Sequence, residues 1–284
     1  MSVVVPLPRL RRRVLAWHRR HGLPAPWRAS GDPYHALVAA VMAQQTRMSR
    51  VLPAFERFVT RFPTAEELAR ATPAEVLRAW EGMGYNLRAL RLREAARAVS
   101  GRGGFPRDAP SLAALPGVGP FTAAIVASFA FGQPVAAVDT NVRRVLTRVF
   151  GEPHATPGRV AELASLALAR SEPARWNQAL MDFGALVCRS RPDCGVCPVS
   201  ELCASRDAAP VPPRRTQPPY RRGSLRWYRG KIVRALRAAD GPLGAASLAK
   251  ALGEAAPDGA FAEALAALVR DGLIVPEEAG YRLP

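Results

Sequence analysis

Lysine is almost absent from this chain. Only two of the 40 basic residues are lysines, Lys231 and Lys250, and both lie near the C-terminus. Residues 1–222 therefore contain no side-chain amine that could attack a substrate and form a Schiff base. Lysine-dependent covalent catalysis is excluded from that part of the chain.

Long apolar runs are missing as well. No run approaches the roughly 18 apolar residues of a membrane span. At the N-terminus the arginines follow a short apolar stretch, which reverses the order of a secretory signal. Hydrophobic residues make up 49% of the chain, which indicates a globular protein. We expect a cytoplasmic protein with no membrane partner.

Acidic residues are few in the first part of the chain. The net charge is +17, and residues 1–222 hold 32 basic and 16 acidic side chains. Residues 223–284 hold 8 basic and 7 acidic side chains. Such an excess of positive charge indicates a polyanionic partner, most simply nucleic acid, bound mainly by residues 1–222.

Alternating strand patterns are also lacking, and the body of the chain is predicted to be all-α. Helical spacing of apolar residues occurs in 35–48, 64–80, 86–100, 121–131, 140–150, 158–170 and 173–187. The proline- and arginine-rich stretch 205–222 is predicted to be an extended linker. The predicted domains are thus 1–204 and 223–284.

The C-terminal domain is predicted to resemble a winged helix. Helices are expected near 225–238, 246–252 and 259–271, followed by a two-stranded ribbon that turns at 278–280. Because residues 223–284 are nearly neutral, a DNA contact and a protein contact are equally open for this domain.

Cysteine occurs only within one short segment, with the spacing C-x5-C-x2-C-x5-C. A disulfide framework fits poorly in a cytoplasmic chain without other cysteines. The spacing alone leaves a four-cysteine zinc site and an iron–sulfur cluster equally open. The predicted metal ligands are Cys188, Cys194, Cys197 and Cys203.

A glycine turn and a carboxylate form the next motif. In LPGVG, Gly117 and Gly119 permit a tight turn, and a helix N-terminus that could hold a phosphate follows at once. Asp139 comes twenty residues later in VDTNVRR, directly before a helix, where capping that helix is its simplest role.

Together, LPGVG, VDTNVRR and the segment ALVCRSRPDCGVCPVSELC resemble the helix-hairpin-helix DNA glycosylases that carry an iron–sulfur cluster. WRASGDPYHALVAAVMAQQT, AWEGMGYNLRA and WNQALMDFGALVC are similar to the MutY branch. The resemblance covers roughly residues 10–205. It implies a two-lobed helical fold with a base pocket between the lobes and a structural [4Fe-4S] cluster. The first gap between cysteines is five residues here and usually six in the family.

The resemblance also implies roles for single residues. Asp139 matches the catalytic aspartate, which stabilises positive charge on the sugar after the base has been flipped out. Gln45 matches a residue inserted into the duplex, with a solvent-exposed helix glutamine as the alternative. Asn141 matches a neighbour of the aspartate, with helix capping as the alternative. The remaining expected DNA- or base-binding residues are Trp27, Arg28 and Tyr85, the two aromatics among them equally compatible with core packing, and Arg189 and Arg191 in the cysteine loop.

Three positions depart from the MutY pattern. Ala40 occupies the place of the glutamate that protonates adenine, and such an acid is worth roughly 10²–10⁴-fold. Gln178 stands where some members have a second glutamate, and Phe121 stands where endonuclease III has its lysine. Both are still expected among the DNA- or base-binding residues. Asp182 is a candidate replacement acid, with helix packing as the alternative.

These residues predict a monofunctional DNA N-glycosylase of base excision repair, active as a monomer on double-stranded DNA in the nucleoid. Overall resemblance favours adenine as the excised base. Loss of the acid favours uracil, thymine or hypoxanthine, which leave as stabilised anions. A non-catalytic lesion or mismatch binder is the main rival, and a zinc-bearing transcription regulator is a more distant one.

Overall fold

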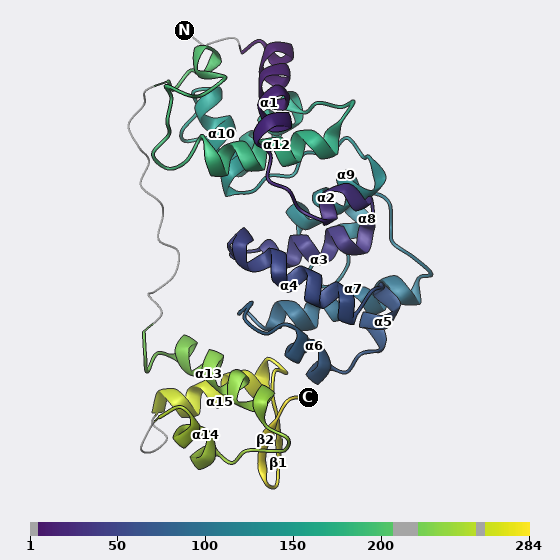
Figure 1. Ribbon diagram of the computed structural model, residues 1–284, viewed down its shortest axis with the longest axis vertical. Coiled ribbons are helices and arrows are strands. Elements are labelled where there is room, and N and C mark those ends of the chain that lie inside the picture. The colour runs from purple at the N-terminus through teal and green to yellow at the C-terminus, as the bar shows by residue number, and fades with distance from the viewer. Residues whose placement is uncertain (1–4, 207–220, 254–258) are drawn as a thin grey trace. The chain divides into compact units, whose positions relative to one another are not determined.

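The computed structural model describes residues 5–206, 221–253 and 259–284. It is mostly helical, as the sequence predicts (Figure 1). The predicted linker lies mostly outside the described residues. No helix in the described ranges is long and apolar enough to cross a membrane. The helices are α1 (Leu7–His21), α2 (Trp27–Ser30), α3 (Pro33–Ala43), α4 (Met48–Arg61), α5 (Ala65–Arg70), α6 (Pro73–Ala79), α7 (Leu87–Gly101), α8 (Ala109–Ala113), α9 (Pro120–Phe131), α10 (Thr140–Val149), α11 (Pro157–Ala167), α12 (Pro173–Leu186), the 3-10 turn η1 (Ser200–Leu202), α13 (Leu225–Ala238), α14 (Ala245–Ala251) and α15 (Gly259–Arg270).

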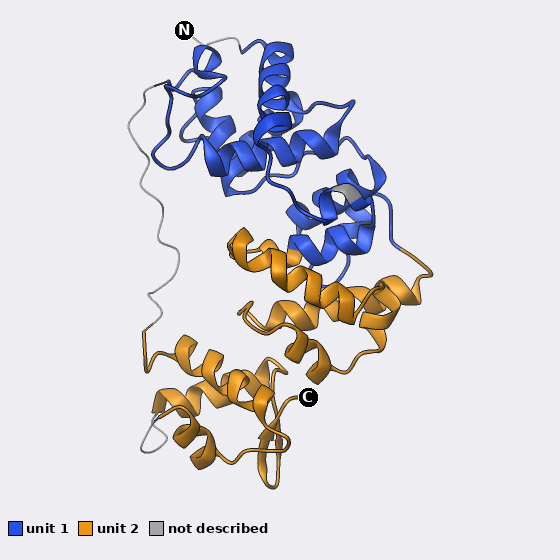
Figure 2. Ribbon diagram, in the orientation of Figure 1, with its two compact units in different colours: residues 1–40, 105–214 blue, residues 41–104, 215–284 orange. Residues whose placement is uncertain are grey.

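Two compact units make up the chain, and each is built from two segments (Figure 2). Unit 1 combines residues 1–40 and 105–214, and unit 2 combines residues 41–104 and 215–284. The predicted domains 1–204 and 223–284 follow chain order instead. The difference arises because α13 to α15 pack in one unit with the helices of residues 41–104.

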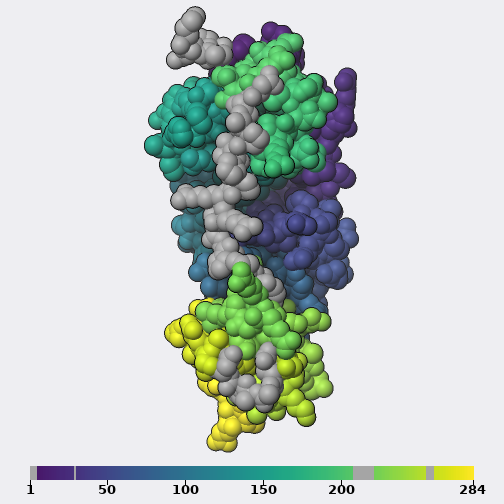
Figure 3. Space-filling model, turned by 90° about the vertical axis from the view of Figure 1, so that its left-hand side faces the viewer, coloured from purple at the N-terminus to yellow at the C-terminus, as the bar shows by residue number. Residues whose placement is uncertain are grey.

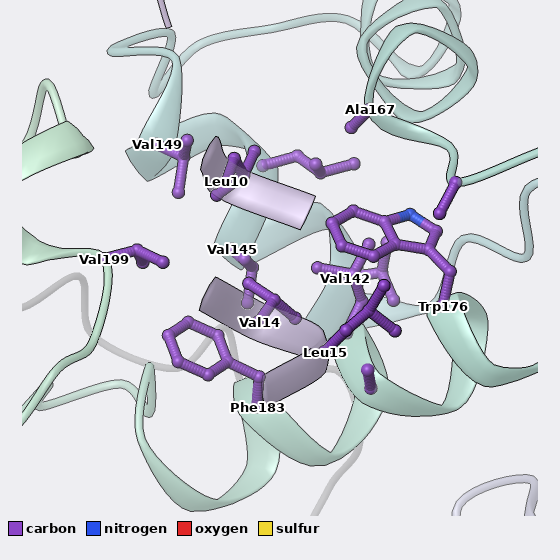
Figure 4. Close-up of a cluster of buried hydrophobic side chains, with 14 of the residues drawn as sticks. Leu10, Val14, Leu15, Val142, Val145, Val149, Ala167, Trp176, Phe183 and Val199 are labelled. Atoms are coloured by element: carbon purple, nitrogen blue, oxygen red, sulfur yellow. The ribbon is translucent and has the colours of Figure 1, made fainter. Parts of the chain in front are cut away.

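The core of unit 1 lies between α1, α10, α11 and α12 (Figure 4). In α10 the buried residues Val142, Val145, Leu146 and Val149 recur at helical spacing, so one face of the helix is apolar. Trp176 and Phe183 of α12 close this core, and each is 1% exposed.

In unit 2 the helix pairs α5–α7 and α6–α7 pack together, and α13 packs on α15. The C-terminal segment has the predicted order of three helices and a ribbon. The ribbon consists of β1 (Val275–Glu277) and β2 (Gly280–Arg282), which pair antiparallel with Val275 opposite Arg282.

Two predicted helices are wrong in extent. The segment 64–80 is two helices, because Thr72 caps α6 in a reciprocal capping box with Glu75 and Pro73 is the first residue of α6. The segment 35–48 ends at Ala43, because Gln45 adopts a left-handed backbone conformation with φ 54°.

Candidate active site

Asp139 lies at the N-cap of α10, as the sequence predicts. One carboxylate oxygen accepts a hydrogen bond from the Val142 backbone N–H at 2.7 Å. The other accepts from Nδ2 of Asn141 at 3.0 Å. The carboxylate is half-buried and held in one orientation. Its capping role and a role in chemistry are therefore compatible, because the oxygens are fixed and still partly accessible.

The segment leading into Asp139 is held by a buried amide that sequence reasoning missed. Asn177 of α12 is 1% exposed. Its oxygen accepts from the Ala137 N–H at 3.1 Å, and its nitrogen donates to the Val135 carbonyl at 2.9 Å and to the Ser128 hydroxyl at 3.1 Å. An asparagine within the mostly apolar WNQAL stretch was the available signal, since buried amides must find partners.

Arg144 ties the same site to the start of the cysteine segment. Its guanidinium donates to Oδ1 of Asn141 at 2.7 Å, to the Gly184 carbonyl at 2.6 Å and to the Cys188 carbonyl at 2.7 Å. Burial lowers the pKa of Arg144 from its usual value. The arginine thereby joins α10, α12 and the cysteine segment around Asp139.

Ala40 lies in an apolar cluster. Its buried partners are Ala124, Ile125 and Ala137, and Phe121 and Met181 pack against the same cluster. The Ala40 side chain carries no group that could supply a proton.

Asp182 does not supply the missing acid. Arg28 grips its carboxylate with two hydrogen bonds of 2.6 and 2.8 Å. The Leu23 N–H donates to it at 3.0 Å, and Nε2 of His18 lies 3.3 Å away. Burial opposes ionisation, but these partners outweigh it and lower the pKa of Asp182 to about 2. The carboxyl group is therefore ionised at neutral pH.

Three expected base-binding residues lie inside unit 1 rather than on its surface. Arg28 is engaged with Asp182, and it also donates to the Leu23 carbonyl at 2.7 Å. Trp27 is 6% exposed and Gln178 is 7% exposed. This burial is what the core-packing alternative requires of Trp27, and a role at a base pocket stays a prediction for all three.

The predicted hairpin is present between α8 and α9. Gly117 has φ 72°, a conformation that favours glycine. Gly119 is the N-cap of α9 and Pro120 its first residue. Both glycines are exposed, and so is Pro120, the first residue of α9. The turn thus has the form that a phosphate-binding hairpin needs.

The four cysteines lie half-buried after α12, and none is in a disulfide. Burial, with a contribution from the other three thiols, raises the pKa of Cys197 to about 11, and burial also raises that of Cys203. Arg148, 8% exposed, donates to Sγ of Cys188 at 3.4 Å and to the Arg189 carbonyl at 2.5 Å. Arg189 and Arg191 are exposed, as expected of a phosphate-contacting loop.

Four cysteines are a donor set used both by zinc sites and by iron–sulfur clusters. The described residues contain no group of three or more His, Cys, Asp or Glu side chains that could hold one metal ion. The four thiols lie on one short segment, and the other three each contribute to the raised pKa of Cys197. Metal binding would remove the protons that burial favours on Cys197 and Cys203.

Gln45 and Tyr85 lie together in unit 2, in loops that share one arginine. Both have left-handed backbones, with φ 54° and 45°, and both are exposed. Arg88 donates to the Gln44 carbonyl at 2.6 Å and to the Gly84 carbonyl at 3.3 Å, and its guanidinium lies 5.5 Å from the Tyr85 ring centre. Burial lowers the pKa of Arg88 to about 10, so it remains cationic at neutral pH. A left-handed backbone is strained in residues other than glycine, and strained residues of this kind are concentrated at functional sites.

Comparison with known proteins gives consistent matches. A model of the HhH-GPD superfamily base excision DNA repair proteins matches residues 38–169. The adenine DNA glycosylase of Mycobacterium tuberculosis is 42% identical over 248 residues, which cover 83% of this chain and 81% of that protein. The human adenine DNA glycosylase is 39% identical over 210 residues, or 68% of this chain and 38% of the human one.

Solved structures with similar folds include a thermostable thymine-DNA glycosylase. It has a TM-score of 0.66 and 30% identity, with 70% of this chain and 95% of that chain covered. A non-covalent complex of endonuclease III with DNA has a TM-score of 0.61 and 25% identity, with 71% and 96% covered.

Proposed function

This chain belongs to the HhH-GPD superfamily of base excision DNA repair glycosylases, and we propose that it is a monofunctional N-glycosylase that removes a mispaired or damaged base from double-stranded DNA. The observation that carries the proposal is the fixed, partly accessible carboxylate of Asp139 at the N-terminus of α10. Breaking a glycosidic bond leaves positive charge on the sugar, and a carboxylate held in place stabilises that charge without reorganising.

The other proposed roles prepare the substrate for this step. The base must leave the stack before its glycosidic bond can be reached. The exposed Gln45 and Tyr85 are proposed to contact the duplex at the flipped base. The hairpin at Gly117 and Gly119 is proposed to hold a phosphate, with Arg189 and Arg191 holding further ones.

The four cysteines are proposed to hold a [4Fe-4S] cluster. When bound, the cluster supplies covalent cross-links that hold the cysteine segment in one shape. Arg148 supports the same segment through the Arg189 carbonyl, and its charge lies beside Cys188, where thiolate ligands would be negative. Arg144 connects the segment to Asn141 and so to Asp139.

The alanine at position 40 favours a base that leaves as a stabilised anion, which means uracil, thymine or hypoxanthine. Adenine must be protonated to leave, and the Ala40 side chain has no proton to give. The 30% identity with a thymine-DNA glycosylase is compatible with this choice. Adenine is the second candidate, because the M. tuberculosis and human relatives are adenine DNA glycosylases.

A substrate screen decides between the two. Duplexes with uracil, thymine, hypoxanthine or adenine opposite guanine or 8-oxoguanine are incubated with the protein, and alkali then cuts any abasic site. We expect cutting of a uracil, thymine or hypoxanthine duplex that depends on the alkali. Borohydride should trap no protein–DNA adduct, because residues 1–222 have no lysine. Cutting of adenine duplexes alone would overturn the choice of base, and tight binding without any cutting would favour the non-catalytic rival.

Gly184 is predicted to be required for the geometry of the site. A Cβ added at this position would lie 2.7 Å from Cβ of Asn141 and 3.0 Å from its carbonyl oxygen. Gly184→Ala should therefore push Asn141 away from Asp139, lower the free energy of unfolding by about 1–3 kcal/mol and slow base removal. Denaturant melts and single-turnover rates measure both effects.

Gly158→Ala is the matched control, since a Cβ there meets no atom within 4 Å. It should leave both the stability and the rate at or above the wild-type values. If Gly184→Ala kept the wild-type stability and rate, α10 and α12 would be able to move apart enough to accept the added Cβ, and the prediction would be wrong.

A further inference from the structure

The near-neutral charge of the C-terminal residues hides a strong separation of charge. The stretch 221–238, which contains α13, holds seven basic residues and no acidic one. The stretch 239–284 holds three basic and seven acidic residues. A polyanion would therefore be attracted to α13 and repelled by the remainder of the domain.

The basic helix packs beside the loop that carries Tyr85. Arg226 donates to the Tyr85 hydroxyl at 2.9 Å, and its guanidinium lies 5.2 Å from the centre of the Tyr85 ring. Arg237, three turns further along the same helix face, donates to Oδ1 of Asn86 at 2.8 Å. Both partners belong to the loop between α6 and α7, and α13 also packs against α6.

The chain end makes a second attachment to the same part of unit 2. The Ala74 N–H, at the start of α6, donates to the Pro284 carbonyl at 2.8 Å. The C-terminal residues are thus joined to the helices of residues 41–104 at two places. Neither attachment involves Arg221, which precedes α13, or Arg234 within it, and both of these residues are exposed.

The helix expected to read DNA in a helix-turn-helix arrangement is a poor candidate here. That helix would be α15, the second of the pair α14 and α15. Its only charged residues are Glu263 and Arg270, so it has no net charge. The positive charge lies on α13 instead.

We propose that α13 extends the DNA-binding surface of unit 2, with Arg221 and Arg234 binding backbone phosphates of the duplex that Tyr85 contacts. Arg226 is a positioning residue that holds the Tyr85 ring against the helix. This inference rests on the proposed function, because it takes the exposed Tyr85 loop as a DNA contact. In Figure 3, green atoms of this segment lie at the surface of the face drawn.

The test measures binding of the full-length protein to an undamaged duplex over a range of salt concentrations. Each phosphate contact contributes about −0.9 to the slope of log K against log salt. The double variant Arg221→Gln/Arg234→Gln should flatten the slope by roughly 2 and weaken binding at low salt. The matched control Lys250→Gln/Arg270→Gln removes two exposed charges from α14 and α15 and should leave the slope unchanged.

Equal salt slopes for the wild type and both double variants would overturn the inference. An acidic protein would then be the better candidate for the partner of α13. Equal flattening in both would also overturn it, since the effect would then come from net charge alone. Undamaged DNA keeps the test separate from catalysis: a protein that binds with the expected slope change but excises no base fails only the proposed function.

A double-mutant cycle tests the positioning role of Arg226. Arg226→Ala and Tyr85→Phe should each weaken DNA binding, and the double variant should be no weaker than the worse single one, because both remove the same hydrogen bond. Arg226→Lys should restore part of the loss. Fully additive losses would overturn this role.

Discussion

Asp139→Asn is expected to slow base removal by about 10²–10³-fold or more while the fold is retained. The carboxylate is the negative group proposed to face the positive charge that develops on the sugar, and an amide of the same shape carries no charge. Asparagine also caps helices about as well as aspartate does, so the hydrogen bond from the Val142 N–H can persist. Loss of activity in this variant therefore reports on charge and not on unfolding.

Single-turnover rates on the best substrate of the screen measure the effect, with circular dichroism melts beside them. Asp108→Asn is the matched control, because Asp108 caps α8 through the Ser111 N–H at 2.9 Å in the same way. The control should keep the wild-type rate. A rate for Asp139→Asn within a factor of ten of the wild type would rule out Asp139 as the catalytic carboxylate.

Asp182→Asn is expected to lower the free energy of unfolding by about 3–5 kcal/mol. The side chain of Asp182 is 4% exposed and that of Arg28 is 14% exposed. Without the carboxylate, the Arg28 guanidinium stays buried with its charge uncompensated, which costs more than the pair itself contributes. Glu201→Gln is the control, because Glu201 forms exposed ion pairs with Arg9 and Arg13 that should contribute little.

Stability should also depend on pH through Asp182. Its pKa falls from 3.8 to about 2 on folding, so the folded state favours the ionised form. This contribution is fully present above the unfolded pKa and is lost as the pH falls through the folded one, in the window from about pH 4 down to 2. Chemical denaturation at several pH values should show a steeper loss across this window for the wild type than for Asp182→Asn. Parallel curves would contradict the assignment.

Local signals predicted much of the fold. Helix α13 was predicted as 225–238, and the structure has the same bounds. The cap at Asp139 and the hairpin at Gly117 were also readable, because a cap or a tight turn depends on a few neighbouring residues. Thr72, Pro73 and Glu75 form a local helix-start signal, so the break between α5 and α6 could also have been predicted. It was not predicted, because apolar residues keep helical spacing across 64–80. The turn at Gln45 was not readable, because Arg88 supports it through the Gln44 carbonyl, 44 positions away.

The sequence by itself determined the family, the positions of the four cysteines, the aspartate proposed as catalytic and the absence of lysine from residues 1–222. These follow from residue types at fixed spacings. Only the tertiary structure decided what each arginine does. Three of the 38 arginines illustrate this. Arg28 pairs with Asp182, 154 residues away in the sequence, and Arg226 donates a hydrogen bond to Tyr85, 141 residues away. Arg88 joins two loops through hydrogen bonds to their carbonyls. All arginines carry the same charge and donors, so the partner and the burial of each depend on which distant groups folding brings within hydrogen-bonding distance.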